Sequence, residues 1–147
     1  VFSDNVCPWC FVGKRNLEKG MKDYIAEHSN QQQEDFNVEW KPFFLDLESP
    51  ESSDVPIREY LNRKYGEGAG TRMSRALAQA GERCGIDFNN DRVVHNTVKS
   101  HRLLMRAKDQ GKQDEMIEAI FHAYFEEGRN IADPSVLVDI ANKVWGS

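Results

Sequence analysis

The sequence has no long apolar run, no cluster of basic residues and few cysteines. A membrane-spanning helix needs about 20 consecutive apolar residues, and no stretch of this chain approaches that length, so we expect no membrane partner. The formal net charge of −5 argues against nucleic acid as the main partner, because phosphate backbones are bound by clustered Lys and Arg side chains. The length of 147 residues, without an internal repeat or a shift in composition, favours a single domain over residues 1–147.

Only three cysteines are present, which excludes a small domain held together by disulfides. Cys7 and Cys10 form a C-x-x-C motif, and Cys84 stands alone. An odd count that includes one such pair favours a redox pair plus a separate thiol in a reducing compartment, so the sequence predicts a cytoplasmic protein. A zinc site would need two more ligands, and His95 and His101 are six residues apart, on different faces of a helix. We therefore expect no bound metal and no bound cofactor.

The C-x-x-C motif lies between a short apolar segment, residues 1–3, and a long helical pattern. Proline is tolerated at the first position of a helix, so Pro8 predicts Cys7 as the N-cap and Cys10 as the third helical residue. A thiolate is favoured at the positive end of the helix dipole, where the pKa of a cysteine falls from about 8.5 toward 3.5–7.5. Residues three apart on a helix are neighbours, so the two sulfurs can form a disulfide after a small adjustment.

The two sulfurs are expected to have different roles. Steps of three and four along the helix from Cys10 reach Gly13, Leu17, Met21 and Tyr24, a mainly apolar stripe that should face the core. Cys10 lies on that stripe, whereas Cys7 lies at the tip of the helix. We expect Cys7 to attack the substrate sulfur and Cys10 to resolve the mixed disulfide.

The rest of the chain predicts one more strand and several helices. Apolar and polar residues alternate over 36–41, which predicts a half-buried strand. A helix from Pro8 to about Glu27 would connect residues 1–3 to this strand, so the two strands should be parallel. Five further helices are predicted over about 57–65, 71–84, 96–110, 116–127 and 134–144.

Several polar residues have a plain structural interpretation. Cys84 shares a helix face with Leu77 and Ala80, which predicts a buried, inert thiol. A carboxylate beside a thiol raises its pKa, so we expect Asp4 to serve in a turn or cap rather than in activating a cysteine. Asn96 is expected to cap a helix, and His101 is expected to pack with its polar atoms satisfied.

The segment from Phe2 to Lys14 resembles the active-site segment of DsbA-like thioredoxin-fold oxidoreductases. It is most similar to the branch related to 2-hydroxychromene-2-carboxylate isomerases and kappa-class glutathione transferases. Other segments that fit this branch are Trp40–Leu45, Lys64–Gly66, Asn96–Thr97 with His101–Leu103, and Ala123–Phe125. The resemblance implies an α/β, thioredoxin-like fold with a large helical insertion at about 55–128.

In the resembled family, a β-hairpin and a final helix follow the insertion, and we expect both to be missing here. A sheet of two strands is marginal, and the apolar faces packed on it would be partly bare. This predicts that the chain is a fragment of a longer domain, or that a second copy supplies the missing layer in a homo-oligomer.

The resemblance and the motif together predict a thiol-disulfide oxidoreductase with Cys7 and Cys10 as catalytic residues. Pro8 and Trp9, between the two cysteines, are expected to contact the substrate. The expected partners are protein or small-molecule thiols and disulfides, with glutathione as one candidate. Two alternatives stay open: a glutathione-dependent isomerase or transferase of the related branch, whose members have serine where Cys7 stands, and a catalytically silent binding module.

Overall fold

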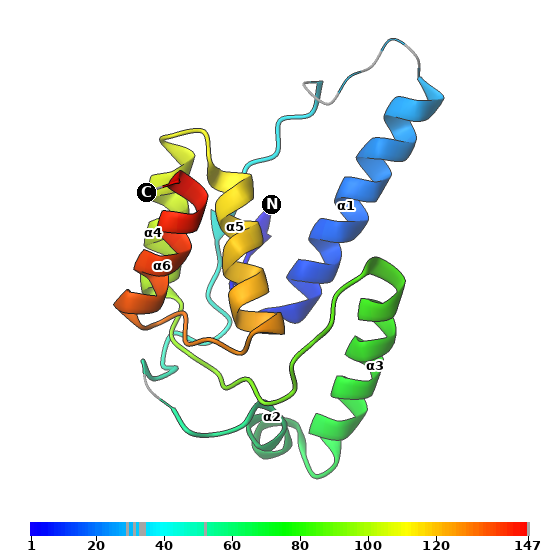
Figure 1. Ribbon diagram of the computed structural model, residues 1–147. Coiled ribbons are helices and arrows are strands. Elements are labelled where there is room, and N and C mark those ends of the chain that lie inside the picture. Colours follow the sequence, from blue (N-terminus) through cyan, green and yellow to red (C-terminus); the bar gives the residue numbers. More distant parts are fainter. Residues whose placement is uncertain (29, 31, 33–34, 52, 147) are drawn as a thin grey trace.

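Helices make up most of the chain, and they surround a two-stranded parallel sheet (Figure 1). The computed structural model describes residues 1–28, 30, 32, 35–51 and 53–146. The elements in chain order are β1 (Phe2–Ser3), α1 (Pro8–Glu27), β2 (Lys41–Pro42), α2 (Ile57–Tyr65), α3 (Ala69–Cys84), α4 (Val98–Lys108), α5 (Gln113–Phe121), the π-helix η2 (His122–Glu126) and α6 (Pro134–Trp145). Helices α4, α5 and α6 pack together on one side, and α3 packs against α1 and α2 on the other.

The sheet has the predicted parallel pairing, with Phe2 opposite Lys41. The strand predicted over 36–41 is wrong in its extent, because β2 comprises only Lys41–Pro42. The backbone just before β2 has another partner: the amide of Trp40 donates to Oε1 of Gln113 at 2.9 Å, and Nε2 of Gln113 donates to the Trp40 carbonyl at 2.9 Å. A side chain of α5 therefore satisfies the groups that a longer strand would have used.

The helix bounds follow the predictions where a local signal sets them. α1 begins at Pro8 after the N-cap Cys7, and α6 begins at Pro134, where Oδ1 of Asp133 accepts a hydrogen bond from Ser135 N at 2.8 Å. α3 begins two residues earlier than predicted, because Gly68 takes a left-handed conformation, with φ of 76°, that turns the chain directly from α2 into α3.

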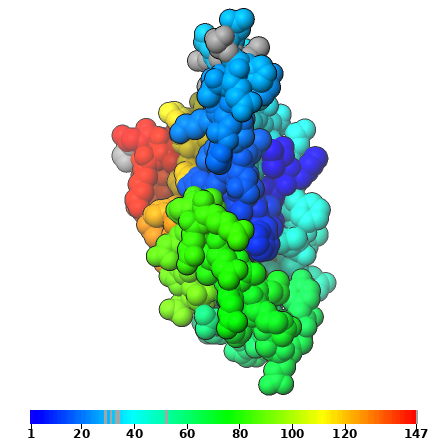
Figure 2. All heavy atoms as spheres, turned by 90° about the vertical axis from the view of Figure 1, so that its right-hand side faces the viewer, coloured from blue at the N-terminus to red at the C-terminus, as the bar shows by residue number. Residues whose placement is uncertain are grey.

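The predicted core-facing stripe of α1 is wrong beyond its first turn. Leu17 and Tyr24 are 36% and 44% exposed, whereas the buried residues of α1 are Phe11, Val12 and Lys14. The helix has 20 residues, and only its N-terminal half is covered by neighbours; the C-terminal half projects above the rest of the molecule in Figure 2. Within the described ranges, no helix is both long and apolar enough to cross a bilayer.

An aromatic cluster fixes the N-terminal half of α1 in the core. The ring of Phe11 lies 5.1 Å from Phe121 and stacks on Phe125 at 5.8 Å between centroids, and Trp40 meets Phe121 edge-on at 6.4 Å. All four rings are at most 2% exposed. Since Phe11 directly follows Cys10, this packing holds the C-x-x-C turn in place.

A cluster of charges around the buried Lys14 also ties α1 to α5. Lys14 is 2% exposed, hydrogen-bonds Glu18, and its Nζ lies 3.0 Å from Glu118 and 3.4 Å from Asp114. Burial by itself lowers the pKa of Lys14, but hydrogen bonds with Glu18 and Glu118 outweigh burial and raise that pKa above its ordinary value. Arg15 also pairs with Glu118, so this carboxylate accepts from two cations on α1.

Candidate functional site

The C-x-x-C motif forms the first turn of α1. Cys7 is the N-cap with extended backbone (φ −87°, ψ 107°), and Pro8 occupies the first helical position, as predicted. The amide of Cys7 donates to the Asp4 carbonyl at 3.0 Å, and the amide of Cys10 donates to the Cys7 carbonyl at 3.0 Å. The turn therefore follows from the proline and from the backbone just before it.

Buried polar side chains support this turn from below. Asp4 is 2% exposed; its Oδ2 accepts from Leu45 N at 2.7 Å, and its Oδ1 lies 3.3 Å from Nε2 of His101. Next to it, Nδ2 of Asn5 donates to Oγ of Ser100 at 2.8 Å. The turn role predicted for Asp4 is confirmed. His101 is buried as expected, but among the described residues its Nδ1 has no hydrogen-bond partner, so the prediction that all its polar atoms are satisfied is wrong. These contacts anchor the segment before Cys7 to the loop after β2 and to α4.

The two sulfurs are not joined, and they face different surroundings. Cys7 and Cys10 are both free thiols of intermediate exposure. Cys10 packs against the hydrophobic core, which agrees with the first position of the predicted stripe. Cys7 instead lines a cleft in the protein surface. An incoming molecule would therefore meet the sulfur of Cys7 first.

The pKa of Cys10 is lowered to about 6. The largest cause is the interaction with the Cys7 thiol, and the nearby hydroxyl of Ser3 and backbone amide of Asp4 also lower this pKa. Burial and the carboxylate of Asp4 act in the opposite direction but are weaker. A thiolate at Cys10 is thus stabilised by the polar groups around it.

The pKa of Cys7 is raised far above the ordinary thiol range. Its proton forms the hydrogen bond to Cys10, burial disfavours a charge, and a second anion would stand beside the first; the amides of Cys10 and Trp9 only partly offset this. The dithiol therefore loses one proton easily and shares the other between its sulfurs. The first ionisation therefore belongs to the pair of thiols rather than to one sulfur, and the expectation that Cys7 carries the thiolate stays a prediction.

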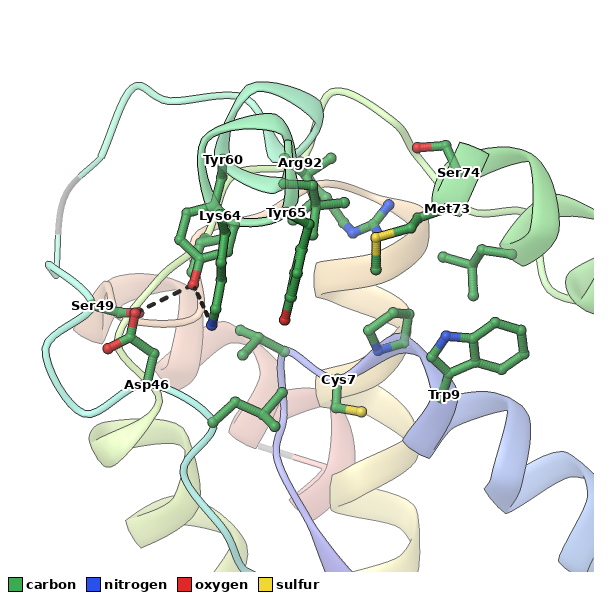
Figure 3. Close-up of a pocket in the computed structure, with 17 residues that line it drawn as sticks. Cys7, Trp9, Asp46, Ser49, Tyr60, Lys64, Tyr65, Met73, Ser74 and Arg92 are labelled. Atoms are coloured by element: carbon green, nitrogen blue, oxygen red, sulfur yellow. Dashed lines mark hydrogen bonds between the residues drawn. The ribbon is translucent and has the colours of Figure 1, made fainter. Parts of the chain in front are cut away.

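The cleft beside Cys7 has a volume of about 400 Å³. It opens between the N-terminus of α1, the loop after β2, and helices α2 and α3 (Figure 3). Pro8 and Trp9 both line it, and Trp9 is 50% exposed. The structure thus places these two residues beside Cys7 on the cleft wall, while their contact with a substrate stays a prediction. Half of the other lining residues are aliphatic or thioether side chains: Val6, Leu45, Ile57, Leu61, Met73, Leu77 and Val94.

Sequence reasoning missed the polar residues on the far wall of the cleft. Tyr60, Lys64 and Tyr65 come from α2, and Arg92 comes from the segment between α3 and α4. Lys64 and Tyr65 belong to one of the segments that resemble the DsbA-like family, so a weak signal was present for them. Arg92 has no local signal, because it lies outside any periodic pattern and only the fold brings it to the cleft.

The remaining thiol lies apart from the pair. Cys84, at the end of α3, is partly buried, packs against the core, and its Sγ donates to the Ala80 carbonyl at 3.2 Å. This placement agrees with the structural role predicted for it. Over the part of the chain that the structure describes, no three His, Cys, Asp or Glu side chains come together as a metal site.

A strand, a crossover helix that starts with C-x-x-C, and a second parallel strand define a thioredoxin-like protein. The family model of the DSBA-like thioredoxin domain matches residues 1–145, so the chain belongs to the DsbA-like thioredoxin family. The DsbA-like family and the thioredoxin-like fold predicted from the sequence are thereby confirmed.

The chain is similar to two proteins over almost all of its length. It is 30% identical to the uncharacterized protein YwbO of Bacillus subtilis (strain 168) over 149 residues, which cover 98% of this chain and 64% of YwbO. The solved structure of the probable DsbA oxidoreductase SCO1869 from Streptomyces coelicolor matches with a TM-score of 0.83 and 27% identity, over 98% of this chain and 61% of that one. The chain thus spans less than two thirds of the length of each relative.

Proposed function

We propose that this chain is a thiol-disulfide oxidoreductase that works through Cys7 and Cys10. The observation that carries the proposal is the dithiol itself: two free thiols in the first turn of a helix, with Cys7 lining a cleft, Cys10 against the core, and the pKa of Cys10 lowered to about 6. Membership of the DsbA-like family and the similarity to a probable DsbA oxidoreductase support it.

The shared proton gives each sulfur a role in the exchange. The Cys7 proton passes along the hydrogen bond to the Cys10 thiolate, and the Cys7 sulfur attacks one sulfur of a substrate disulfide. That disulfide breaks, the first substrate thiolate leaves, and a mixed disulfide with Cys7 remains. Cys10 then releases its proton to solvent and attacks the Cys7 sulfur, which expels the second thiolate. Two electrons pass to the substrate, and the reverse sequence oxidises a substrate dithiol.

The lowered pKa of Cys10 also affects the balance between the dithiol and disulfide forms of the pair. At pH 7 the reduced pair carries one thiolate, which the Cys7 hydrogen bond stabilises, whereas the disulfide form has no charge to stabilise. A stabilised reduced form makes the disulfide a stronger oxidant. Exchange is reversible, and its net direction depends on the reduction potential of the substrate couple. The substrates would be protein or small-molecule thiols and disulfides, and the cytoplasmic location stays a prediction from the cysteine count.

The test is dithiol oxidation and insulin reduction by the wild-type chain and by single cysteine variants. Cys7→Ser should abolish exchange, because it removes the attacking sulfur. Cys10→Ser should accumulate mixed disulfides with Cys7, because the resolving sulfur is gone. Cys84→Ser, the matched control, should retain full activity. If the wild-type chain is inactive in both directions, or if Cys7→Ser leaves exchange intact, the proposal is wrong, and a binding module without chemistry becomes the better account.

A further inference from the structure

The wall of the cleft contains a buried cation. Arg92 is 4% exposed and lines the cleft. Its guanidinium lies 5.9 Å from the ring centroid of Phe88 and 5.6 Å from that of Phe125, and its Nη1 donates to the Asn89 carbonyl at 2.8 Å. Its other polar neighbour is the hydroxyl of Tyr124. Buried charges in proteins are nearly always paired with an opposite charge.

Arg92 has no such opposite charge. Among the residues that the structure describes, no carboxylate lies within ion-pair distance of its guanidinium, and its Nε is buried without a hydrogen-bond partner. Desolvation accordingly lowers the pKa of Arg92. Burying an unpaired guanidinium is costly, and an anion that enters the cleft would offset part of that cost.

Two further charged groups lie at the mouth of the cleft (Figure 3). Lys64 donates from Nζ to the Tyr60 hydroxyl at 3.3 Å and lies over the rings of Tyr60 and Tyr65 at 5.6 and 5.7 Å. Asp46 accepts from the same hydroxyl at 3.3 Å and from the Glu48 amide at 3.0 Å. The carboxylate of Asp46 is thus held by its own loop and by α2. The cleft as a whole carries two positive charges and one negative charge.

We propose that the cleft binds small disulfides that carry a carboxylate, with Arg92 as the residue that receives this carboxylate. The proposal rests on the proposed function and names the substrate class for the same site. A volume of about 400 Å³ suits a small molecule rather than a folded protein surface. The apolar and aromatic walls would hold the body of the ligand while its sulfur lies at Cys7.

The reaction in the cleft is the exchange described above. The Cys7 sulfur bonds to one sulfur of the bound disulfide, the substrate S–S bond breaks, and the first carboxylate-bearing thiolate leaves. Cys10 then closes the Cys7–Cys10 disulfide and expels the second thiolate. The substrate gains two electrons, the dithiol loses them, and the two thiol protons pass to solvent or to the released thiols.

The test compares an anionic and a neutral aromatic disulfide. The probes are 5,5′-dithiobis(2-nitrobenzoate) and 4,4′-dithiodipyridine, each followed by release of its coloured thiol at neutral pH and constant ionic strength. All proteins carry Cys84→Ser, so that the Cys7/Cys10 pair is the only source of signal. Arg92→Met should lower the rate constant for the anionic probe at least about tenfold, because a charge-assisted hydrogen bond is lost. The rate for the neutral probe should change less than about twofold, and Arg92→Lys should restore part of the anionic rate.

Arg106→Met is the matched control, because Arg106 is an exposed arginine on α4 outside the cleft. It changes the net charge by the same amount and should leave both rates unchanged. Equal losses with both probes in Arg92→Met would overturn the proposal and make Arg92 a packing residue.

A measurement on the protein that retains Arg92 covers the case in which Arg92→Met does not fold. In the protein that retains Arg92, 4-nitrobenzoate should slow alkylation of Cys7 at concentrations at which 4-nitrobenzamide has no effect. Equal protection of Cys7 by the two compounds would overturn the proposal. If neither disulfide reacts at Cys7, the proposed function itself is wrong. If both disulfides react but Arg92→Met slows them equally, only the role of Arg92 is wrong.

Discussion

At the scale of single residues, the proposed thiol-disulfide chemistry depends on how the thiols of Cys7 and Cys10 share one proton. The sequence predicted a dithiol at the start of α1 with Cys7 as the N-cap, but it did not predict that the two thiols share a proton. The N-cap argument considers only the helix, whereas Cys10 also receives a hydrogen bond from Cys7 and donors from Ser3 and Asp4. Those donors come from the segment before the helix, and their geometry depends on the buried contacts of Asp4. No local pattern in the sequence contains that information.

Removing the Cys7 thiol should raise the pKa of Cys10. In Cys7→Ala the sulfur of Cys10 loses its main donor, so its pKa should move from about 6 toward the ordinary thiol value. The measurement is the pH dependence of alkylation at Cys10, compared with the pH dependence of thiolate absorbance in the wild-type protein. A Cys10 that still ionises near pH 6 in Cys7→Ala would show that the two sulfurs do not share a proton.

At the scale of elements, the predictions were right where a local signal sets a boundary and wrong where a tertiary contact sets it. The starts of α1 and α6 were predicted because a capping residue and a proline stand together at each. The extent of β2 was not predicted, because it depends on Gln113 of α5. The buried face of α1 was not predicted either, because it depends on which half of the helix its neighbours cover. Arg92 could not be predicted as a cleft residue for the same reason.

The ion cluster between α1 and α5 should contribute measurably to stability. Glu118→Gln leaves the buried Lys14 with one partner fewer, and it should lower the free energy of unfolding by about 1–3 kcal/mol, since Glu118 is itself partly exposed. Asp23→Asn breaks the exposed Lys19–Asp23 pair on the same helix and should leave the free energy of unfolding nearly unchanged. The measurement is urea unfolding of the three proteins, and equal losses in both variants would contradict this role.

The same cluster predicts a pH dependence. Burial raises the pKa of Glu118, but hydrogen bonds from Arg15 and Lys14 outweigh burial and bring it below 4.5. A carboxyl group whose pKa is lower in the folded state than in the unfolded state stabilises the protein. This stabilisation is complete at pH values above the pKa of the unfolded state and is lost as the pH falls through the pKa of the folded state. The stability difference between the wild-type protein and Glu118→Gln should therefore be constant near neutral pH and shrink in acid. A difference that does not change down to about pH 3 would contradict the assignment.

At the scale of the whole molecule, large apolar side chains remain exposed on and around the sheet. Phe2, Phe43, Leu45 and Leu47 are between 52% and 71% exposed. The two-stranded sheet and its bare apolar residues agree with the expectation of partly uncovered faces, while what covers them stays a prediction.

These exposed residues should make the chain bind an apolar dye or self-associate at micromolar concentration. Phe2→Ser combined with Leu47→Ser should reduce either behaviour, because both side chains lie in solvent and contribute apolar area. Dye fluorescence and sedimentation velocity are the measurements. Thiol-disulfide exchange is the internal control, since neither residue lines the cleft. A monomer that melts cooperatively and binds no dye would refute the expectation of an uncovered apolar surface.

The most direct test of the central claim is the reduction potential of the Cys7/Cys10 pair as a function of pH, measured in Cys84→Ser against a dithiol buffer. The account predicts a reversible two-electron couple whose potential falls by about 59 mV per pH unit below the first thiol pKa and by about 30 mV per pH unit above it, because one proton fewer is taken up there. The break should fall at about pH 6, the pKa of Cys10. A pair that forms no disulfide, or a single slope of about 59 mV per unit through neutral pH, would contradict it.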